Sequence, residues 1–418
     1  ESESRGLGDV YKRQVKAFTQ ADVDCELFCE MPEGFTKGCE GFVLLLLKAL
    51  EGIKQGAYLW AQLNRKVLKE LGFESSLNEP NLYRHKTLKV RAGVFADDVL
   101  AAYAPDAEGE YLLLRAEYGK RIKIDSSVPR PMTKFTGVQF EHETGTKKAR
   151  LHQEQYFDQL ATLYKGRFDL KTTPVGKSKA DREKFEKMEP GKEDDEMCDQ
   201  TEYLSLLGAL LYPSVMTRMD LAPYLVTLCS AMNKATTTHF GYALHLLGYA
   251  INTKKFGLMI DANDIKKPMG VDSVDENFYL SFGLHVYSDS SWGKVPKPLG
   301  GYAIIMAMIA VDWCAKLLKI VADSSCEAET ATGSRATKAI MFVREIASFL
   351  GIPIKGPTLM MIDNEAMLKL CSKDGATART RYFIRATTFV KDAAQKCIIK
   401  LVLVPTDLEI ADLFTKAL

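Results

Sequence analysis

The nine cysteines of this sequence form none of the local patterns that bind metals. No two of them make a Cys-x-x-Cys pair, and none stands at zinc-ligand spacing from a histidine. The sequence therefore gives no support to a zinc site, and scattered cysteines of this kind indicate a reducing compartment.

Membrane-spanning apolar runs and an excess of positive charge are also missing. The apolar run at 42–47 is too short to cross a bilayer and is followed directly by Lys48. No signal-peptide segment opens the chain, so we expect a soluble protein without a membrane partner. Lys and Arg number 55 against 54 Asp and Glu, so the net charge does not indicate a nucleic-acid partner.

The sequence does have the length and apolar content for two or three domains, because 418 residues with 46% hydrophobic side chains can bury more than one core. We leave residues 1–14 out of the prediction of the fold. The string DVYKRQ at 9–14 is what a widely used sequencing-library adaptor encodes in one reading frame. We interpret the segment as a cloning or assembly scar and expect the true chain to begin upstream.

Residues 15–280 divide into two parts. In 15–180, apolar spacing predicts a helix at 59–71, and a strand, tight turn and strand at 90–100 with Asp97 and Asp98 at the tip. Residues 177–200 are charge-dense and predict an exposed loop. In the second part, 181–280, the apolar stretches 204–211 and 239–251 predict a helical connection.

The pattern changes after residue 280. Strands are predicted at 284–287, 302–308 and 311–313, followed by a helix at 327–350 that ends at Gly351. A strand at 358–362, helices at 365–370 and 382–394, a strand at 398–404 and a helix at 409–416 complete the chain. With the two middle helices taken as one crossover, the order is βββαβαβα, which predicts a mixed sheet flanked by helices.

Four acidic residues fall where this layout brings them to one edge of the sheet. Asp289 ends the first strand, Asp363 ends the fourth, and Glu329 and Asp412 lie in the first and last helices. Each acid alone is more often a cap or turn residue. Several like charges can be buried together only if cations neutralise them, so the set predicts two Mg²⁺ ions, with Mn²⁺ as a substitute. Two such ions would suit hydrolysis of a nucleic-acid backbone.

The segments around these acids are YSDSSW at 287–292, SSCEAE at 324–329, IDNEA at 362–366 and IADLFTKAL at 410–418. In sequence and order they closely resemble the ribonuclease H of copia-type retrotransposons. The resemblance implies that the four acids bind the metal ions and cut RNA paired with DNA. It matches Glu329 to the family's catalytic glutamate, which leaves Glu327 as an acid of the helix N-terminus.

The resemblance has one departure in this region. Copia-type sequences commonly carry a Lys-His-Ile segment where this chain has RYF at 381–383, and no histidine follows His285. Turnover is expected to be slower if that histidine assists product release in relatives. Residues 371–400 hold seven basic side chains against two acidic ones, and Arg379 and Arg381 among them would suit substrate phosphates. A solvated helix face explains such a run about as often.

Upstream motifs follow in the order MPEGF at 31–35, KALEGIKQGAYLW at 48–60, FADD at 95–98, KFTGV at 134–138 and TRMD at 217–220. They resemble the copia-type reverse transcriptase. The resemblance implies that Asp97 and Asp98 hold two Mg²⁺ ions in the palm, and that Lys54 and Gln55 face nucleotide and template. Taken alone, an Asp-Asp pair is usually a solvated turn, and Lys54 and Gln55 are equally consistent with a helix surface.

The family's first catalytic aspartate is not found. Relatives carry Asp-Val-Lys-x-Ala-Phe, whereas QVKAF at 14–18 places Gln14 before the Val-Lys pair, next to the interpreted scar. Two acids without their third partner should hold catalytic metals poorly, so we expect no polymerisation by this fragment. Each of the three tryptophans, Trp60, Trp292 and Trp313, is expected to be a core residue rather than a base-stacking platform.

The fold expected from these observations is a multidomain α/β and α+β chain. It comprises a truncated reverse transcriptase palm and thumb at 15–180, a helical connection at 181–280 and a ribonuclease H-like mixed sheet at 281–418. The resemblance implies a fragment of a retrotransposon polyprotein. Its expected location is a cytoplasmic virus-like particle, and the parent complex could also enter the nucleus. Its implied partners are RNA/DNA hybrids, template-primer and other parts of the polyprotein.

Two alternatives remain. The chain could be a catalytically inactive nucleic-acid-binding remnant of a decayed or domesticated element, although the four intact acids favour an enzyme. A host ribonuclease H fused to an unrelated domain is opposed by the ordered motifs upstream.

Overall fold

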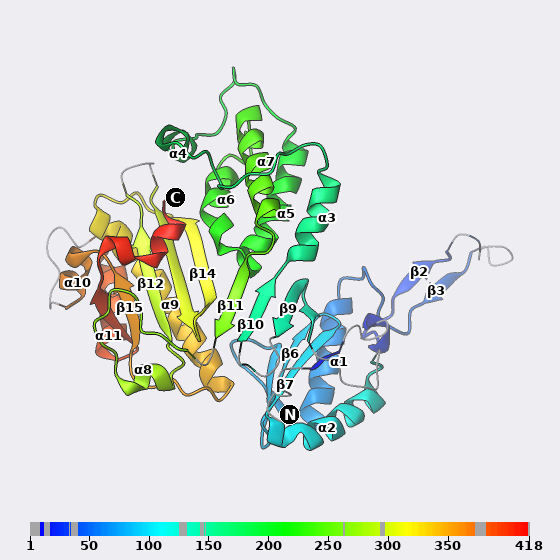
Figure 1. Ribbon diagram of the computed structural model, residues 1–418. Helices are drawn as coiled ribbons and strands as arrows, with labels where there is room; N and C mark the ends of the chain where they lie inside the picture. The colour runs from blue at the N-terminus through cyan, green and yellow to red at the C-terminus, as the bar shows by residue number, and fades with distance from the viewer. Residues whose placement is uncertain are drawn as a thin grey trace. The chain divides into compact units, whose positions relative to one another are not determined.

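The computed structural model describes residues 9–11, 17–32, 34, 41–124, 132–142, 146, 148–261, 264–292, 297–372 and 382–416. The chain forms two compact units, Glu1–Thr136 and Gly137–Leu418 (Figure 1). Within the described residues, no helix has both the length and the apolar character that crossing a bilayer requires.

The first unit is built on an antiparallel sheet with two helices. Its strands run in the order β1-β7-β6-β5-β4, and a separate hairpin pairs β2 with β3. The strands are β1 (Asp9–Tyr11), β2 (Phe28–Glu30), β3 (Val43–Leu45), β4 (Phe73–Ser75), β5 (Leu82–His85), β6 (Val90–Phe95) and β7 (Asp98–Tyr103); the helices are α1 (Gly56–Glu70), α2 (Glu108–Arg121) and the 3-10 turns η1 (Phe18–Gln20) and η2 (Pro105–Ala107). The predicted helix at 59–71 and the hairpin at 90–100 are both present.

One face of this sheet packs against both helices. Val90 and Ala92 on β6 alternate with exposed or half-buried neighbours and join Trp60 of α1 and Tyr111 of α2 in one core. This alternation is what a strand with one covered face requires. Trp60 is 2% exposed, which confirms the core position predicted for it.

The second unit begins with a small sheet and a helical bundle. The sheet pairs β9 (Val138–His142), β10 (Lys148–His152) and β11 (Gly257–Asp261), all antiparallel. The short strand β8 (Lys134–Phe135) precedes them in the chain, at the end of the first unit. The bundle comprises α3 (Glu154–Leu163), α4 (Lys179–Glu186), α5 (Gln200–Met216), η3 (Met219–Leu221), α6 (Ala222–Cys229) and α7 (Thr237–Asn252). The helices predicted at 204–211 and 239–251 lie within α5 and α7.

The predicted loop at 177–200 is wrong in part, because it contains α4. Ser178 caps this helix by accepting a hydrogen bond from the backbone N–H of Asp181, whose side chain accepts from Ser178 in return. Such a capping box starts a helix even where few apolar residues are present. The Ser178 and Asp181 pair is a local helix-start pattern, but the many charged residues around it are more typical of a loop.

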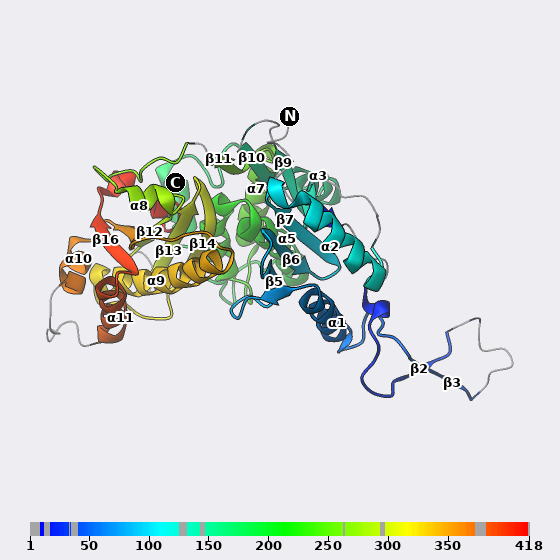
Figure 2. The same cartoon turned by 90° about the horizontal axis from the view of Figure 1, so that it is seen from below.

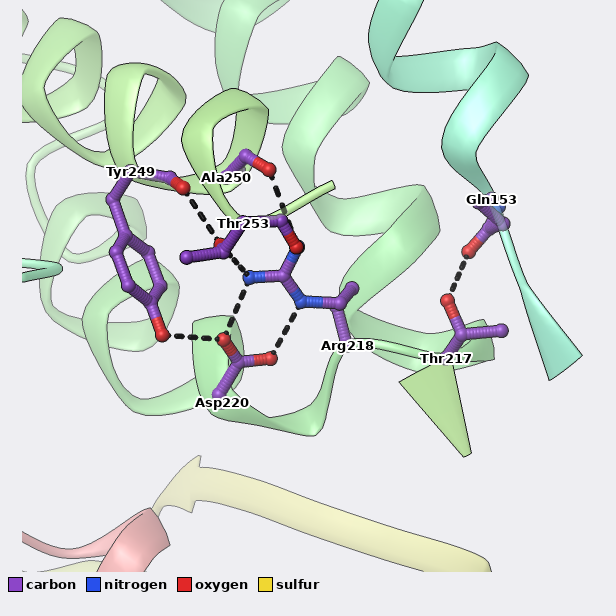
Figure 3. Close-up of polar contacts among 7 residues, drawn as sticks. All are labelled: Gln153, Thr217, Arg218, Asp220, Tyr249, Ala250 and Thr253. Carbon is purple, nitrogen blue, oxygen red and sulfur yellow. Dashed lines mark hydrogen bonds and ion pairs between the residues drawn. The ribbon is translucent and has the colours of Figure 1, made fainter. Parts of the chain in front are cut away.

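The TRMD motif at 217–220 is a buried polar link between α5 and α7 (Figure 3). Arg218 is only 1% exposed. Its Nε and Nη2 bind the two carboxylate oxygens of Asp220 at 2.9 and 2.8 Å. Nη2 also donates to Thr253 Oγ1, and Nη1 donates to the carbonyls of Ala250 and Thr253, so all five guanidinium hydrogens have acceptors. The motif therefore serves the fold of this unit.

The second unit ends in the predicted mixed sheet. The strand order is β14-β13-β12-β15-β16, in which β12–β15 and β15–β16 are parallel and the other pairs antiparallel. The elements are α8 (Glu276–Leu280), β12 (His285–Ser290), β13 (Leu299–Met306), β14 (Ile309–Leu317), α9 (Ser325–Phe349), β15 (Thr358–Ile362), α10 (Glu365–Ser372), α11 (Ile384–Gln395), β16 (Ile399–Leu403), η4 (Thr406–Leu408) and η5 (Ile410–Phe414). From β12 to β16 their order matches the prediction.

Helices and turns cover both faces of this sheet. On one face, Ile340 of α9 and Val390 of α11 share a core with Val286 and Met360 of the strands, and Figure 2 shows α9 running along that face. On the other face, Phe414 of η5 packs with Tyr287. The predicted final α-helix at 409–416 is instead the 3-10 helix η5.

Candidate metal centre

Two parallel strands bring Asp289 and Asp363 to one edge of the mixed sheet. The register pairs Tyr287 of β12 with Met361 of β15. Asp289 lies two residues after Tyr287 on β12, and Asp363 lies two residues after Met361, just beyond the end of β15. Because side chains alternate along a strand, both acids emerge on the same face as Tyr287 and Met361.

The third acid comes from the N-terminal turns of α9. Ser324 caps this helix by accepting a hydrogen bond from the backbone N–H of Glu327. Glu327 in turn accepts from the backbone N–H of Asp323 at 2.9 Å, which confirms it as an acid of the helix N-terminus. Two residues further, Glu329 reaches the end of β12, where its Oε1 accepts from the backbone N–H of Ser290 at 3.2 Å.

Carboxylate oxygens of Asp289, Glu329 and Asp363 all lie within 4.8 Å of one another. Asp289 and Glu329 are buried, and Asp363 is partly exposed. Across the described ranges, no other three histidine, cysteine or acidic side chains come together in this way. The structure thus gathers three of the four acids that the sequence analysis predicted.

Asp412, the fourth predicted acid, lies beside this group but does not join it. Its Oδ1 is 2.5 Å from Lys416 Nζ on the same turn. Its negative charge nevertheless contributes to the raised pKa of Asp289. Thr415 donates a hydrogen bond to Asp289 Oδ2, so η5 contacts the cluster directly.

Burial and mutual repulsion make the ionised cluster unfavourable on its own. Burial, followed by the charges of Asp412 and Asp363, raises the pKa of Asp289 to about 6. Burial and the charge of Asp289 hold the pKa of Glu329 well above its usual value. Glu329 Oε2 is buried without a hydrogen-bond partner. An unpaired buried carboxylate oxygen among like charges is what a divalent cation would neutralise, so this donor set fits Mg²⁺.

Glu409 is a fifth acid at this site that the sequence analysis did not single out. It is 4% exposed, its Oε1 accepts from the backbone N–H of Ala411, and its Oε2 has no partner. Burial, with the charges of Asp289 and Asp363, raises its pKa to about 9. In the sequence, Glu409 stands three residues before Asp412, which was the one indication that it lies near the site. Its position in the sequence does not show that its side chain is buried.

These raised pKa values predict that the stability of the metal-free protein falls as pH rises. The unfolded chain loses the protons of Asp289 and Glu409 near their ordinary pKa values of 3.8 and 4.5. The folded chain keeps the proton of Asp289 up to about pH 6 and that of Glu409 up to about pH 9. From the ordinary pKa of each acid up to its raised value, the folded chain therefore binds more protons than the unfolded chain. We expect the melting temperature measured in EDTA to decline across this window.

Magnesium should reverse this decline above about pH 6, because the ion stabilises the ionised form that folding otherwise disfavours. Calorimetric melting at a series of pH values, with EDTA or with Mg²⁺, measures both effects. A melting temperature that rises with pH in EDTA would contradict the electrostatic description of the cluster.

The Asp97-Asp98 pair lies in the first unit, at the turn between β6 and β7. Phe95 pairs with Asp98 across a two-residue turn in which Ala96 has a φ of 49°. The indole N–H of Trp60 donates to the carbonyl of Ala96 at 2.8 Å and holds the tip in place. Among the described residues, no third acid completes a metal-binding group with this pair.

The other predicted nucleic-acid contacts are described only in part. Lys54 is exposed, and Gln55, at the start of α1, donates from Nε2 to Cys25 Sγ at 3.4 Å. Arg379 and Arg381 lie outside the described residues, as does Gln14. The roles of these residues, and the interpretation of 1–14 as a scar, remain predictions.

Comparison with known proteins identifies the relatives of this chain. The family model described as reverse transcriptase (RNA-dependent DNA polymerase) matches residues 9–169. A retrovirus-related Pol polyprotein from transposon RE2 of Arabidopsis thaliana is 24% identical over 96% of this chain and 26% of its own length. A retrovirus-related Pol polyprotein from transposon TNT 1-94 of Nicotiana tabacum is 24% identical over 98% of this chain and 30% of its own length.

The chain therefore spans between a quarter and a third of the length of these relatives. Among solved structures, a foamy viral protease-reverse transcriptase in complex with dsDNA aligns over 96% of this chain and 70% of its own, at 12% identity and a TM-score of 0.23. A TM-score this low carries no argument about the fold. The family model covers the first part of the chain and the polyprotein relatives cover nearly all of it, so over almost its whole length the chain resembles the retrovirus-related Pol polyproteins of copia-type transposons.

Proposed function

We propose that the C-terminal part of the chain hydrolyses the RNA strand of RNA/DNA hybrids with the help of Mg²⁺. The observation that carries this proposal is the convergence of Asp289, Glu329 and Asp363 within 4.8 Å. These residues come from two parallel strands and a helix far apart in sequence. A mixed sheet with buried acids at one edge is the arrangement expected of a ribonuclease H-like domain.

Each acid would have a distinct part in holding the ions. Asp289, which is 3% exposed, would contribute one oxygen, with Thr415 fixing its orientation. Glu329 has one oxygen tied to Ser290 and one unpaired, so the unpaired Oε2 is the available ligand. Asp363 is partly exposed and oriented by Thr406 Oγ1 at 2.9 Å. As the most exposed of the three acids, it would be the one most accessible to a substrate phosphate.

Asp412 would change partner when metal binds. Its contact with Lys416 leaves a carboxylate close to Asp289, and a nearby divalent cation would compete with that ammonium group. Bound Mg²⁺ would supply an activated water and neutralise the charge that develops on the scissile phosphate. The protein's own contribution is the fixed, largely buried set of oxygens.

Cleavage of defined duplexes tests this proposal. With Mg²⁺, the chain should cut the RNA strand of an RNA/DNA hybrid and leave DNA duplex intact, and EDTA should stop the reaction. A chain that binds hybrids but never cuts them, with Mg²⁺ or Mn²⁺, would instead be the catalytically inactive remnant considered above.

We further propose that the Asp97-Asp98 turn belongs to a polymerase palm that lacks its first catalytic aspartate in this chain. Primer extension on an RNA template should be undetectable for the chain as it stands. Robust synthesis by the unaltered chain would refute the proposal.

A further inference from the structure

Trp292 presents an exposed aromatic ring beside the metal centre. It stands three residues after Asp289, just beyond the end of β12, and is 49% exposed. The chain has three tryptophans, of which Trp60 is buried and Trp313 half-buried. The expectation that all three are core residues is therefore wrong for Trp292, because its ring faces solvent.

The ring is held in a fixed position although it is exposed. Its indole N–H donates to the carbonyl of Ala322 at 2.8 Å. Ala322 precedes the capping turn of α9, the helix that carries Glu329. On the other side, the backbone N–H of Ser291 donates to the carbonyl of Leu299 at 2.9 Å and fixes the chain next to the ring. The hydrogen bond of the indole uses its only polar group and leaves the apolar ring available.

The surroundings of the ring are apolar on one side and acidic on the other. Val321, adjacent to Ala322, is 72% exposed. The carboxylates of Asp289, Glu329 and Asp363 lie at the end of the same strand. Without metal these carboxylates repel phosphates, so an uncharged contact with a base would supply affinity that the acids do not.

We propose that Trp292 is a stacking platform for a nucleotide of the strand next to the scissile phosphate. The inference rests on the proposed function, since only a nucleic-acid substrate brings bases to this edge. Aromatic rings stack on any base through its π-face, so the platform would support binding without selecting sequence. A ring that is already held loses little conformational freedom when the substrate binds, which strengthens the contact.

Binding measurements on a non-cleaving background test the platform. In Asp363→Asn, the affinity for a fluorescently labelled RNA/DNA hybrid is measured by anisotropy. Adding Trp292→Ala should weaken binding roughly tenfold, the scale of one stacked base, whereas Trp292→Phe, which keeps a ring but not the N–H, should bind nearly as well as the background. Trp313→Phe is the matched control, because its N–H bonds to the carbonyl of Ser214 inside the unit.

Tryptophan fluorescence gives a second readout that a merely structural role would not change. Hybrid binding should quench emission in the background and in Trp313→Phe, and the quenching should largely disappear in Trp292→Phe. Equal losses of affinity for the Ala and Phe variants would show that only the hydrogen bond to Ala322 matters, and would overturn the platform. Unchanged affinity in Trp292→Ala would overturn it too.

A cleavage assay separates failure of the platform from failure of the proposed function. If the unaltered chain cuts hybrids in Mg²⁺ while the Trp292 variants bind like the background, the platform is wrong and the nuclease stands. If the binding differences appear but the unaltered chain never cuts, the platform is supported and the nuclease proposal fails. Absence of hybrid binding by the unaltered chain refutes both.

Discussion

Glu329→Gln should abolish metal-dependent cleavage of RNA/DNA hybrids. The unpaired Oε2 of Glu329 is buried among the carboxylates of Asp289 and Asp363. An amide in its place removes one negative charge and can put a hydrogen-bond donor where a cation needs an oxygen. Losing a group that only supports a metal ligand typically costs 10- to 100-fold, so losing a ligand should cost at least about 100-fold in the cleavage rate.

Glu327→Gln is the matched control, because the same change is made two residues away on the same helix. Glu327 accepts a hydrogen bond from the backbone of Asp323 and belongs to the helix start. Glutamine can still accept that bond, so cleavage should stay within a fewfold of the unaltered chain. Rates are measured under single-turnover conditions with a labelled hybrid. Equal effects of the two substitutions would refute the assignment of Glu329 as a ligand.

Glu329→Gln should also stabilise the protein in EDTA, since it removes a charge from a crowded cluster. The variant should therefore melt no lower than the unaltered chain in the absence of metal. This second measurement distinguishes loss of metal binding from loss of folding.

Arg218→Met should lower the free energy of unfolding by about 3 kcal/mol or more, the lower end for breaking a buried ion pair. The substitution leaves Asp220 without its cationic partner and removes the Arg218 donors from the carbonyls of Ala250 and Thr253 (Figure 3). It also removes a cation that lies 5.4 Å from the ring of Phe157 and 5.6 Å from that of Tyr249. Urea denaturation followed by circular dichroism measures the loss.

Lys396→Met provides the comparison for an exposed ion pair. Lys396 lies 2.8 Å from Asp392 one turn earlier on α11, and both side chains are more than half exposed. Such pairs contribute little because water screens them. If the two variants lost the same stability, the buried network would not be what joins α5 to α7.

Much of the C-terminal domain could be predicted from sequence because its signals are local. The alternation and length of the apolar stretches predicted its strands and helices in the correct order. The start of α9 lies within two residues of the predicted Glu327, because its signals, the capping Ser324 and the acid three residues later, act within a single turn. The last element was predicted less well. The spacing at 409–416 suits an α-helix, but the structure has the 3-10 helix η5, whose Phe414 packs against the sheet.

The candidate site was predicted from its residue types and not from its geometry. Asp289, Glu329, Asp363 and Asp412 could be named because each lies in a recognisable segment. The sequence did not show that Asp412 pairs with Lys416 or that Glu409 is buried beside the others. Nor did it show that Trp292 is exposed, since an apolar residue next to a strand is buried or exposed according to what packs over it.

The sequence by itself determined the order of the elements, the acids that a metal could use and the family to which the motifs belong. Only the tertiary structure decided which acids meet, because β12 and β15 are neighbours through a parallel pairing between residues more than 70 positions apart. It also decided which polar groups are buried without a partner. Burial and pairing depend on contacts between distant segments, and those contacts exist only once the chain has folded.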